Sequence, residues 1–112
     1  MKEKLILCFC TVPDGETGRR IAREIVESGL AACVNRLPGV ESVYRWEGRI
    51  EEDGEELLVI KTRADRLANL VDAISRAHPY ELPEVVAVPV TGGLEGYLDW
   101  VAVSSRGPAT NE

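Results

Sequence analysis

The sequence predicts an α+β fold of the ferredoxin-like type, a split βαβ arrangement with one antiparallel sheet and helices on one face. The first observation is the order of patterns, which runs strand, helix, strand, strand, helix, strand and ends with a short C-terminal helix. The second is that residues 5–12 and 56–62 are apolar on both faces, which is typical of central strands. The third is an extended β-hairpin between the two halves. We predict one domain over residues 1–112, with an ordered core of about 3–104 and a mobile tail at 105–112.

The first helix is predicted to follow the first strand directly, with Asp14 or Thr17 as its N-cap. Apolar residues recur at helical spacing after this cap: Ile21, Ala22, Ile25 and Val26. Gly29 supplies the stop signal at the other end. Gly15 and Gly18 are weak helix formers, so we expect a frayed first turn.

The second strand begins near residue 30, bends at Pro38-Gly39 and continues to residue 46 with strict alternation of side-chain character. Either Glu47-Gly48 or Asp53-Gly54 is suited to turn the chain back into the third strand. The resulting hairpin is longer than a fold of this type requires.

The second half repeats the first in outline. Asp65 is predicted to open a helix whose core-facing residues are Leu67, Leu70, Val71 and Ile74. The fourth strand is expected over residues 85–90, and because Pro89 lacks an N–H, that end belongs at an edge or a bulge. Gly92-Gly93 then leads into the terminal helix, with Leu94, Tyr97, Leu98 and Val101 on one side.

One face of the predicted sheet has no helix to cover it. Because the central strands are apolar on both faces, Ile6, Cys8 and Cys10 or their neighbours would be left in water. Either the terminal helix or another subunit must cover them. The long hairpin carries Tyr44 and Trp46, which suit contact with a neighbouring subunit better than a ligand platform.

Composition excludes several classes of function. The formal net charge of −6 repels phosphate backbones, so we expect no nucleic acid partner. No apolar run approaches the roughly 18 residues of a membrane span, so we expect no membrane insertion. The three cysteines contain no Cys-x-x-Cys pair, and no export signal is recognised, so reduced thiols in a cytoplasmic protein are predicted.

The connection between the second helix and the fourth strand is the strongest site candidate. It contains His78, the single histidine of the chain, followed by Tyr80, Glu81 and Glu84 in a turn made rigid by two prolines. An imidazole, a phenol and carboxylates are therefore held close together. The structural alternative is that His78 and Tyr80 pack over the helix end.

Four fragments in this order resemble the CutA family of divalent-cation-tolerance proteins over residues 5–101. The fragments are Cys10-Thr11-Val12-Pro13-Asp14, Leu30-Ala31-Ala32-Cys33-Val34-Asn35 with Tyr44-Arg45-Trp46-Glu47-Gly48, His78-Pro79-Tyr80-Glu81 with Pro83-Glu84, and Tyr97-Leu98-Asp99-Trp100. The resemblance implies a ferredoxin-like subunit in a tight homotrimer, similar to the trimeric P-II signalling proteins. It also implies a cytoplasmic, non-enzymatic protein with a role in the response to metal ions.

The resemblance further implies a copper site. The family's ligands fall on Cys10 and His78, and Glu81 or Glu84 could add a carboxylate. Some members have a second histidine where this chain has Ala77, so we expect copper to bind weakly. The partners implied are divalent metal ions and further copies of the same chain.

A fold of this type also occurs with three other functions. A P-II-like signalling or small-molecule-binding trimer shares the fold and the assembly. An enzyme would use His78 as acid or base with Glu81 orienting it, but no recognisable nucleophile or phosphate-binding loop accompanies them. An RNA-recognition module is excluded because the central strands carry Phe9 as their only aromatic residue and the chain is acidic.

Overall fold

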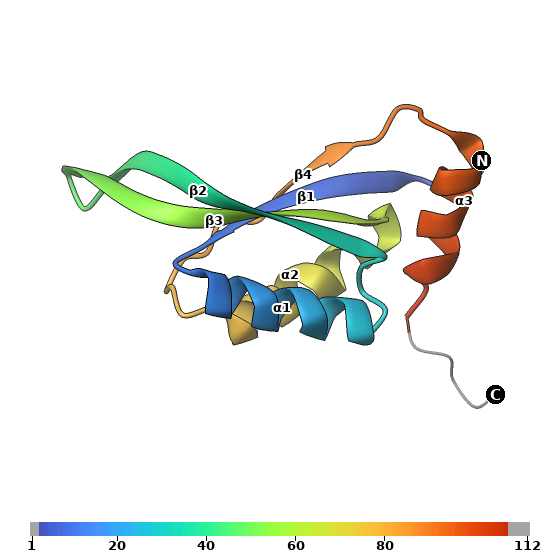
Figure 1. Ribbon diagram of the computed structural model, residues 1–112, viewed down its shortest axis with the longest axis horizontal. Helices are drawn as coiled ribbons and strands as arrows, with labels where there is room; N and C mark the ends of the chain where they lie inside the picture. Colours follow the sequence, from blue (N-terminus) through green and yellow to red (C-terminus); the bar gives the residue numbers. More distant parts are fainter. Residues whose placement is uncertain (1–2, 108–112) are drawn as a thin grey trace.

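The computed structural model describes residues 3–107, which form a four-stranded antiparallel sheet with two helices under one face and a third at one end (Figure 1). The elements follow one another in the predicted order: β1 (Leu5–Val12), α1 (Gly15–Glu27), β2 (Cys33–Trp46), β3 (Arg49–Arg63), a 3-10 turn (Ala64–Arg66), α2 (Leu67–Ala77), β4 (Val86–Pro89) and α3 (Glu95–Ser104). The predicted ferredoxin-like α+β fold is consistent with this arrangement.

The sheet has the strand order β2-β3-β1-β4, so the two strands predicted to be central are central. β1 pairs along its whole length with β3, from Leu5 opposite Arg63 to Val12 opposite Glu56. Its other side pairs with β4 over four residues, from Ile6 opposite Pro89 to Phe9 opposite Val86. Pro89 therefore lies in an edge strand, as its missing N–H requires.

The hairpin of β2 and β3 extends beyond the helix layer (Figure 1). Its turn is Glu47-Gly48, one of the two predicted alternatives, and both residues have positive φ angles of 50° and 79°. Two successive positive φ angles match the right-handed twist of the flanking strands. Asp53-Gly54 lies within β3 instead, which is longer than predicted at its start. The expected bend at Pro38-Gly39 is present as a register shift between Leu37 and Val40.

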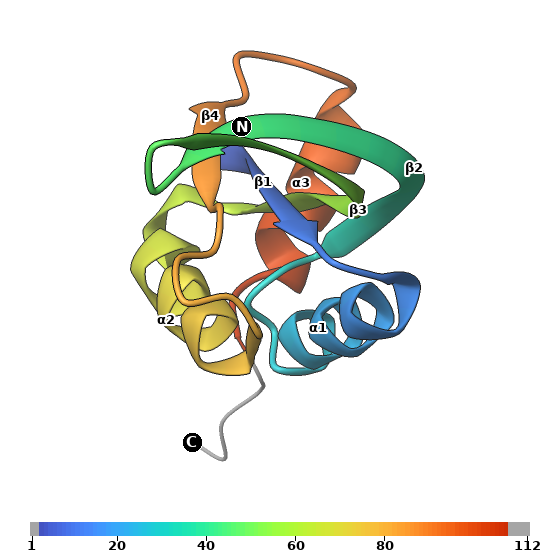
Figure 2. The same cartoon turned by 90° about the vertical axis from the view of Figure 1, so that its left-hand side faces the viewer.

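The main core lies between the sheet and the helices α1 and α2 (Figure 2). Every second residue of β1 points into it, and these side chains meet the apolar stripes of both helices: Ile6, Cys8, Cys10, Val12, Ile21, Ile25, Leu70 and Ile74. Asp14 caps α1 by accepting a hydrogen bond from the Thr17 N–H at 2.8 Å. We expected a frayed first turn, but the helix begins at Gly15 and Gly18 is buried, so the first turn is packed.

The second face of the sheet is covered at one end only. α3 packs there on Leu5 and Ala32 through Val101 and Ala102. Leu94, which was expected on the same side of this helix, is 79% exposed at its N-cap. None of the helices within residues 3–107 has the length and apolar character that crossing a bilayer would need.

The predicted mobile tail starts in an ordered region. Ser105 is fully buried, and its hydroxyl donates a hydrogen bond to the Val101 carbonyl oxygen at 2.7 Å. Packing thus continues past the predicted limit at residue 104. The rest of the predicted tail, residues 108–112, lies outside the described residues.

Candidate functional site

His78 lies at the C-terminal end of α2. Its side chain forms a hydrogen bond with the backbone of β1 just beyond the part of β1 that pairs with β4. The ladder between β1 and β4 ends at Phe9, and two residues further the Thr11 carbonyl oxygen lies 2.8 Å from His78 Nε2. The Tyr80 backbone N–H donates to His78 Nδ1 at 3.1 Å. Because Nδ1 accepts, Nε2 carries the proton and donates to Thr11. Both ring nitrogens are therefore used, and the residue is only 7% exposed.

Cys10 shares a hydrogen-bond acceptor with His78. Its thiol donates weakly to the same Thr11 carbonyl oxygen at 3.8 Å. The side chain is fully buried on the helix side of the sheet. Burial, assisted by the negative charge of Glu84, raises the pKa of the Cys10 thiol to about 12. The thiol is thus protonated at neutral pH.

Glu81, the third predicted metal ligand, does not form a metal-binding group with this pair. It is exposed at the rim of a neighbouring cavity, and within the described part of the chain it forms no hydrogen bond or ion pair. Across residues 3–107, no three histidine, cysteine or acidic side chains are grouped so that they could hold a metal ion. As arranged here, Glu81 does not join Cys10 and His78 in a three-ligand metal site.

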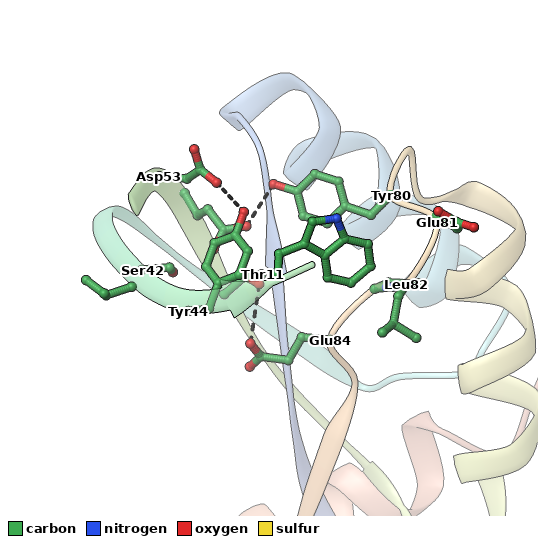
Figure 3. Close-up of a pocket in the computed structure, with 12 residues that line it drawn as sticks. Thr11, Ser42, Tyr44, Asp53, Tyr80, Glu81, Leu82 and Glu84 are labelled. Atoms are coloured by element: carbon green, nitrogen blue, oxygen red, sulfur yellow. Dashed lines mark hydrogen bonds between the residues drawn. The ribbon is translucent and has the colours of Figure 1, made fainter. Parts of the chain in front are cut away.

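A cavity of about 690 Å³ opens beside this segment, between the hairpin and the connection after α2 (Figure 3). The Tyr80 hydroxyl donates to Glu55 Oε2 at 2.8 Å, and the Tyr44 hydroxyl donates to Asp53 Oδ2. At the lower side, Thr11 Oγ1 contacts Glu84 Oε1 at 3.5 Å. Two phenols and four carboxylates, those of Asp53, Glu55, Glu81 and Glu84, thus line a single cavity.

Hydrogen bonding and burial in this cavity raise the pKa of both phenols. The bond to Asp53 raises the pKa of Tyr44 to about 12. Burial and then the bond to Glu55 raise the pKa of Tyr80 further. Asp53 and Glu55 were not predicted to belong to a site, since Asp53-Gly54 was considered as a possible turn. The period-2 pattern of β3 places both on one face, which was the available signal.

A second polar cluster joins the start of α1 to the sheet. Arg36 Nε donates to the buried Glu56 carboxylate at 2.8 Å, and its Nη2 donates to the Gly15 carbonyl oxygen at 2.9 Å. The Glu56 carboxylate lies against Gly18, where an added Cβ would be 2.0 Å from Glu56 Oε2. The two glycines of the first turn therefore leave room for an ion pair.

The uncovered part of the second sheet face is apolar. Cys8 and Cys10 point toward the helices, so Leu7 and Phe9 point to the opposite face, together with Val88 and Val86 opposite them on β4. Val86 is 52% exposed and Val88 40%. The expected exposed patch thus exists, but it consists of the neighbours of Ile6, Cys8 and Cys10 and not of these residues themselves.

Comparison with known proteins identifies one family. The family model described as CutA1 divalent ion tolerance protein matches residues 6–104. The chain is 50% identical over 101 residues to the chloroplastic protein CutA of Arabidopsis thaliana, covering 90% of this chain and 56% of that protein. It is 47% identical over 91 residues to the divalent-cation tolerance protein CutA of Thermus thermophilus, covering 81% and 88%. The chain spans little more than half the length of its plant and human relatives.

Solved structures with this fold carry the same family name. The crystal structure of CutA1 from Oryza sativa has a TM-score of 0.90 at 47% identity, covering 93% of this chain and 95% of that one. The structure from Archaeoglobus fulgidus, described as a periplasmic divalent cation tolerance protein CutA, has a TM-score of 0.88 at 35% identity, covering 91% and 99%.

Proposed function

The chain belongs to the CutA1 divalent ion tolerance protein family, and from this membership we propose that it acts as a non-enzymatic homotrimer in tolerance of divalent metal ions. The membership supports the link to metal ions, and the name of the Thermus relative expresses the same role. Assembly into trimers and binding of copper go beyond the family name.

The observation that carries the assembly proposal is the exposed apolar face of the sheet. Leu37, Val86 and Val88 are each at least 40% exposed and continue a surface that begins with the half-buried Leu7 and Phe9. Soluble monomers rarely leave such a continuous apolar surface in water. Both edge strands, β2 and β4, also present unpaired backbone groups that a neighbouring copy can use. Rotation about a threefold axis closes such a head-to-tail contact into a ring.

We expect light scattering after size exclusion to give a mass of three times 12.3 kDa at micromolar protein concentration. The apolar face provides the driving force, so the mass should not change when the salt concentration is raised. A stable species with the mass of one subunit would contradict the assembly proposal, whatever the role in metal tolerance.

Copper binding at Cys10 and His78 remains a prediction, and the geometry supports only a weak interaction. Copper would have to displace the proton of a buried thiol with a pKa of about 12. It would also have to compete with the Thr11 carbonyl oxygen for His78 Nε2. Ala77 offers no donor beside His78. Each of these changes lowers the affinity.

In isothermal titration with copper, we expect the parent to bind weakly and both Cys10→Ser and His78→Ala to bind at least tenfold more weakly, a change of about 1.4 kcal/mol. Thermal melts of the same samples serve as the control, because His78→Ala also removes the donor to the Thr11 carbonyl oxygen. Equal copper affinity in the three proteins would exclude this site.

An enzymatic role for His78 has little structural support. A general base needs a ring nitrogen within reach of a substrate, whereas both nitrogens are bound to Thr11 and Tyr80. Glu81 does not contact the ring within the described residues. We therefore propose that His78 is a structural residue of the turn.

We also propose a cytoplasmic location. It is supported by three free cysteines among the described residues, of which Cys8 and Cys10 are buried. Relatives are named for different compartments, chloroplastic in Arabidopsis and periplasmic in Archaeoglobus, so the family alone does not decide the location.

A further inference from the structure

We propose that the cavity between the hairpin and the residue 80–84 connection binds an organic cation with more than one amino group, such as a linear polyamine. The volume of about 690 Å³ lies within the range of small-molecule sites, roughly 300–1,000 Å³. The inference is independent of copper binding at Cys10 and His78, because it uses a different set of side chains.

The charge of the cavity selects a cation. Four carboxylates line it, from Asp53, Glu55, Glu81 and Glu84. The lining, which lies entirely within the described residues, includes no lysine, arginine or histidine. An anionic ligand would therefore meet only repulsion, whereas a cation would offset the negative charges of the lining.

The lone pairs that remain free favour N–H donors. Asp53 and Glu55 each accept a phenol hydrogen on one oxygen, which leaves the second oxygen of each carboxylate available. The hydroxyl groups of Tyr44 and Tyr80 point toward one another, and each holds one of these carboxylates by a hydrogen bond (Figure 3). An ammonium group entering the cavity can thus form charge-assisted hydrogen bonds with side chains that are already oriented.

Aromatic walls add a second attraction for the same class of ligand. Tyr44 is 41% exposed and Trp46 37%, and both line the cavity together with Tyr80. Aromatic faces attract ammonium groups through the ring quadrupole and also contact the methylene groups between them. An inorganic ion would gain nothing from the methylene contact.

The spacing of the carboxylates argues against a single metal ion. No three acidic, histidine or cysteine side chains within residues 3–107 are grouped closely enough to hold one. Charges spread along a cavity match a ligand whose charges are also spread, as in spermidine. The ligand class therefore follows from the separation of the carboxylates as well as from their sign.

The test is isothermal titration of the full chain with spermidine, and in parallel with magnesium chloride, in a buffer of low ionic strength. We expect saturable spermidine binding that weakens as salt is added. Glu55→Gln and Asp53→Asn should each weaken it about tenfold, because each removes a charged acceptor. Glu52→Gln is the matched control: it makes the same change on β3, but outside the cavity lining, and should leave the affinity unchanged.

Three outcomes would overturn the inference. One is the absence of saturable spermidine binding, as expected if a neighbouring subunit fills the cavity. Another is magnesium binding as tightly as spermidine, which would indicate a metal site. The third is equal weakening by Glu52→Gln, which would indicate attraction to the acidic surface in general. Light scattering on the same samples reports the subunit number separately, so a failure of the trimer proposal is distinguishable.

Discussion

Replacing Gly18 with alanine is expected to lower the melting temperature by roughly 8 °C, corresponding to a loss of about 2 kcal/mol. The new Cβ would lie 2.0 Å from Glu56 Oε2 and 3.2 Å from Val12 Cγ2. Because Glu56 is 6% exposed and held by Arg36, its carboxylate cannot move without leaving its partner. The steric cost outweighs the gain of about 1 kcal/mol that alanine normally brings to a helix.

A matched control for this variant is Gly96→Ala in α3. That glycine is also helical, and an added Cβ would meet no atom within 4 Å. The control should therefore be neutral or slightly stabilising. Combining Gly18→Ala with Glu56→Ala makes room for the methyl group, so Gly18→Ala should cost much less in that background. An unchanged melting temperature for Gly18→Ala alone would show that the buried carboxylate is not fixed.

Replacing Val88 with lysine is expected to convert the proposed trimer into folded monomers at micromolar concentration. Val88 lies on the open face of the edge strand β4 and is 40% exposed in a single subunit. A charge there would be buried three times in a symmetric trimer, at a cost of several kcal/mol for each unpaired ion. Lysine on an edge strand also blocks strand pairing with a neighbour.

The control variant is Val26→Lys, since Val26 is 41% exposed but lies on α1, in the helix layer. Light scattering should give one subunit mass for Val88→Lys and the parent mass for Val26→Lys, and circular dichroism should show that both are folded. If Val88→Lys kept the parent mass, the open sheet face would not be the interface.

The order of the elements was predictable because the hydrophobic patterns agree with the positions of the cap and turn residues. Leu5–Val12 is apolar on both faces and is a central strand. Asp14 caps the start of the first helix, and Gly29, with a positive φ angle, follows directly after its end. The face assignment of β1 was not predictable, because a strand that is apolar on both sides gives no sign of which side meets the helices.

The candidate site was predictable only in part. The pairing of β1 with β4 brings the end of β1 to the segment after α2, where Cys10 and His78 share the Thr11 carbonyl oxygen as acceptor. The hydrogen-bond partners of His78 are backbone groups of Thr11 and Tyr80, which no pattern of side chains reveals. The cavity was missed for a related reason: Tyr80 and Glu55 are 25 residues apart and meet only because the hairpin lies over the turn.

The strand order has a consequence for the sequence of events during folding. β2 and β3 are joined by the short turn at Glu47-Gly48, so their pairing closes a small loop. β4 reaches β1 with Ile6 opposite Pro89, a contact that spans most of the chain and has a larger entropic cost of closure. We therefore expect β4 to be added late. Because Val86 and Val88 complete the open face, a nascent chain does not present this surface until its own fold is nearly finished, which limits premature association between incompletely folded chains.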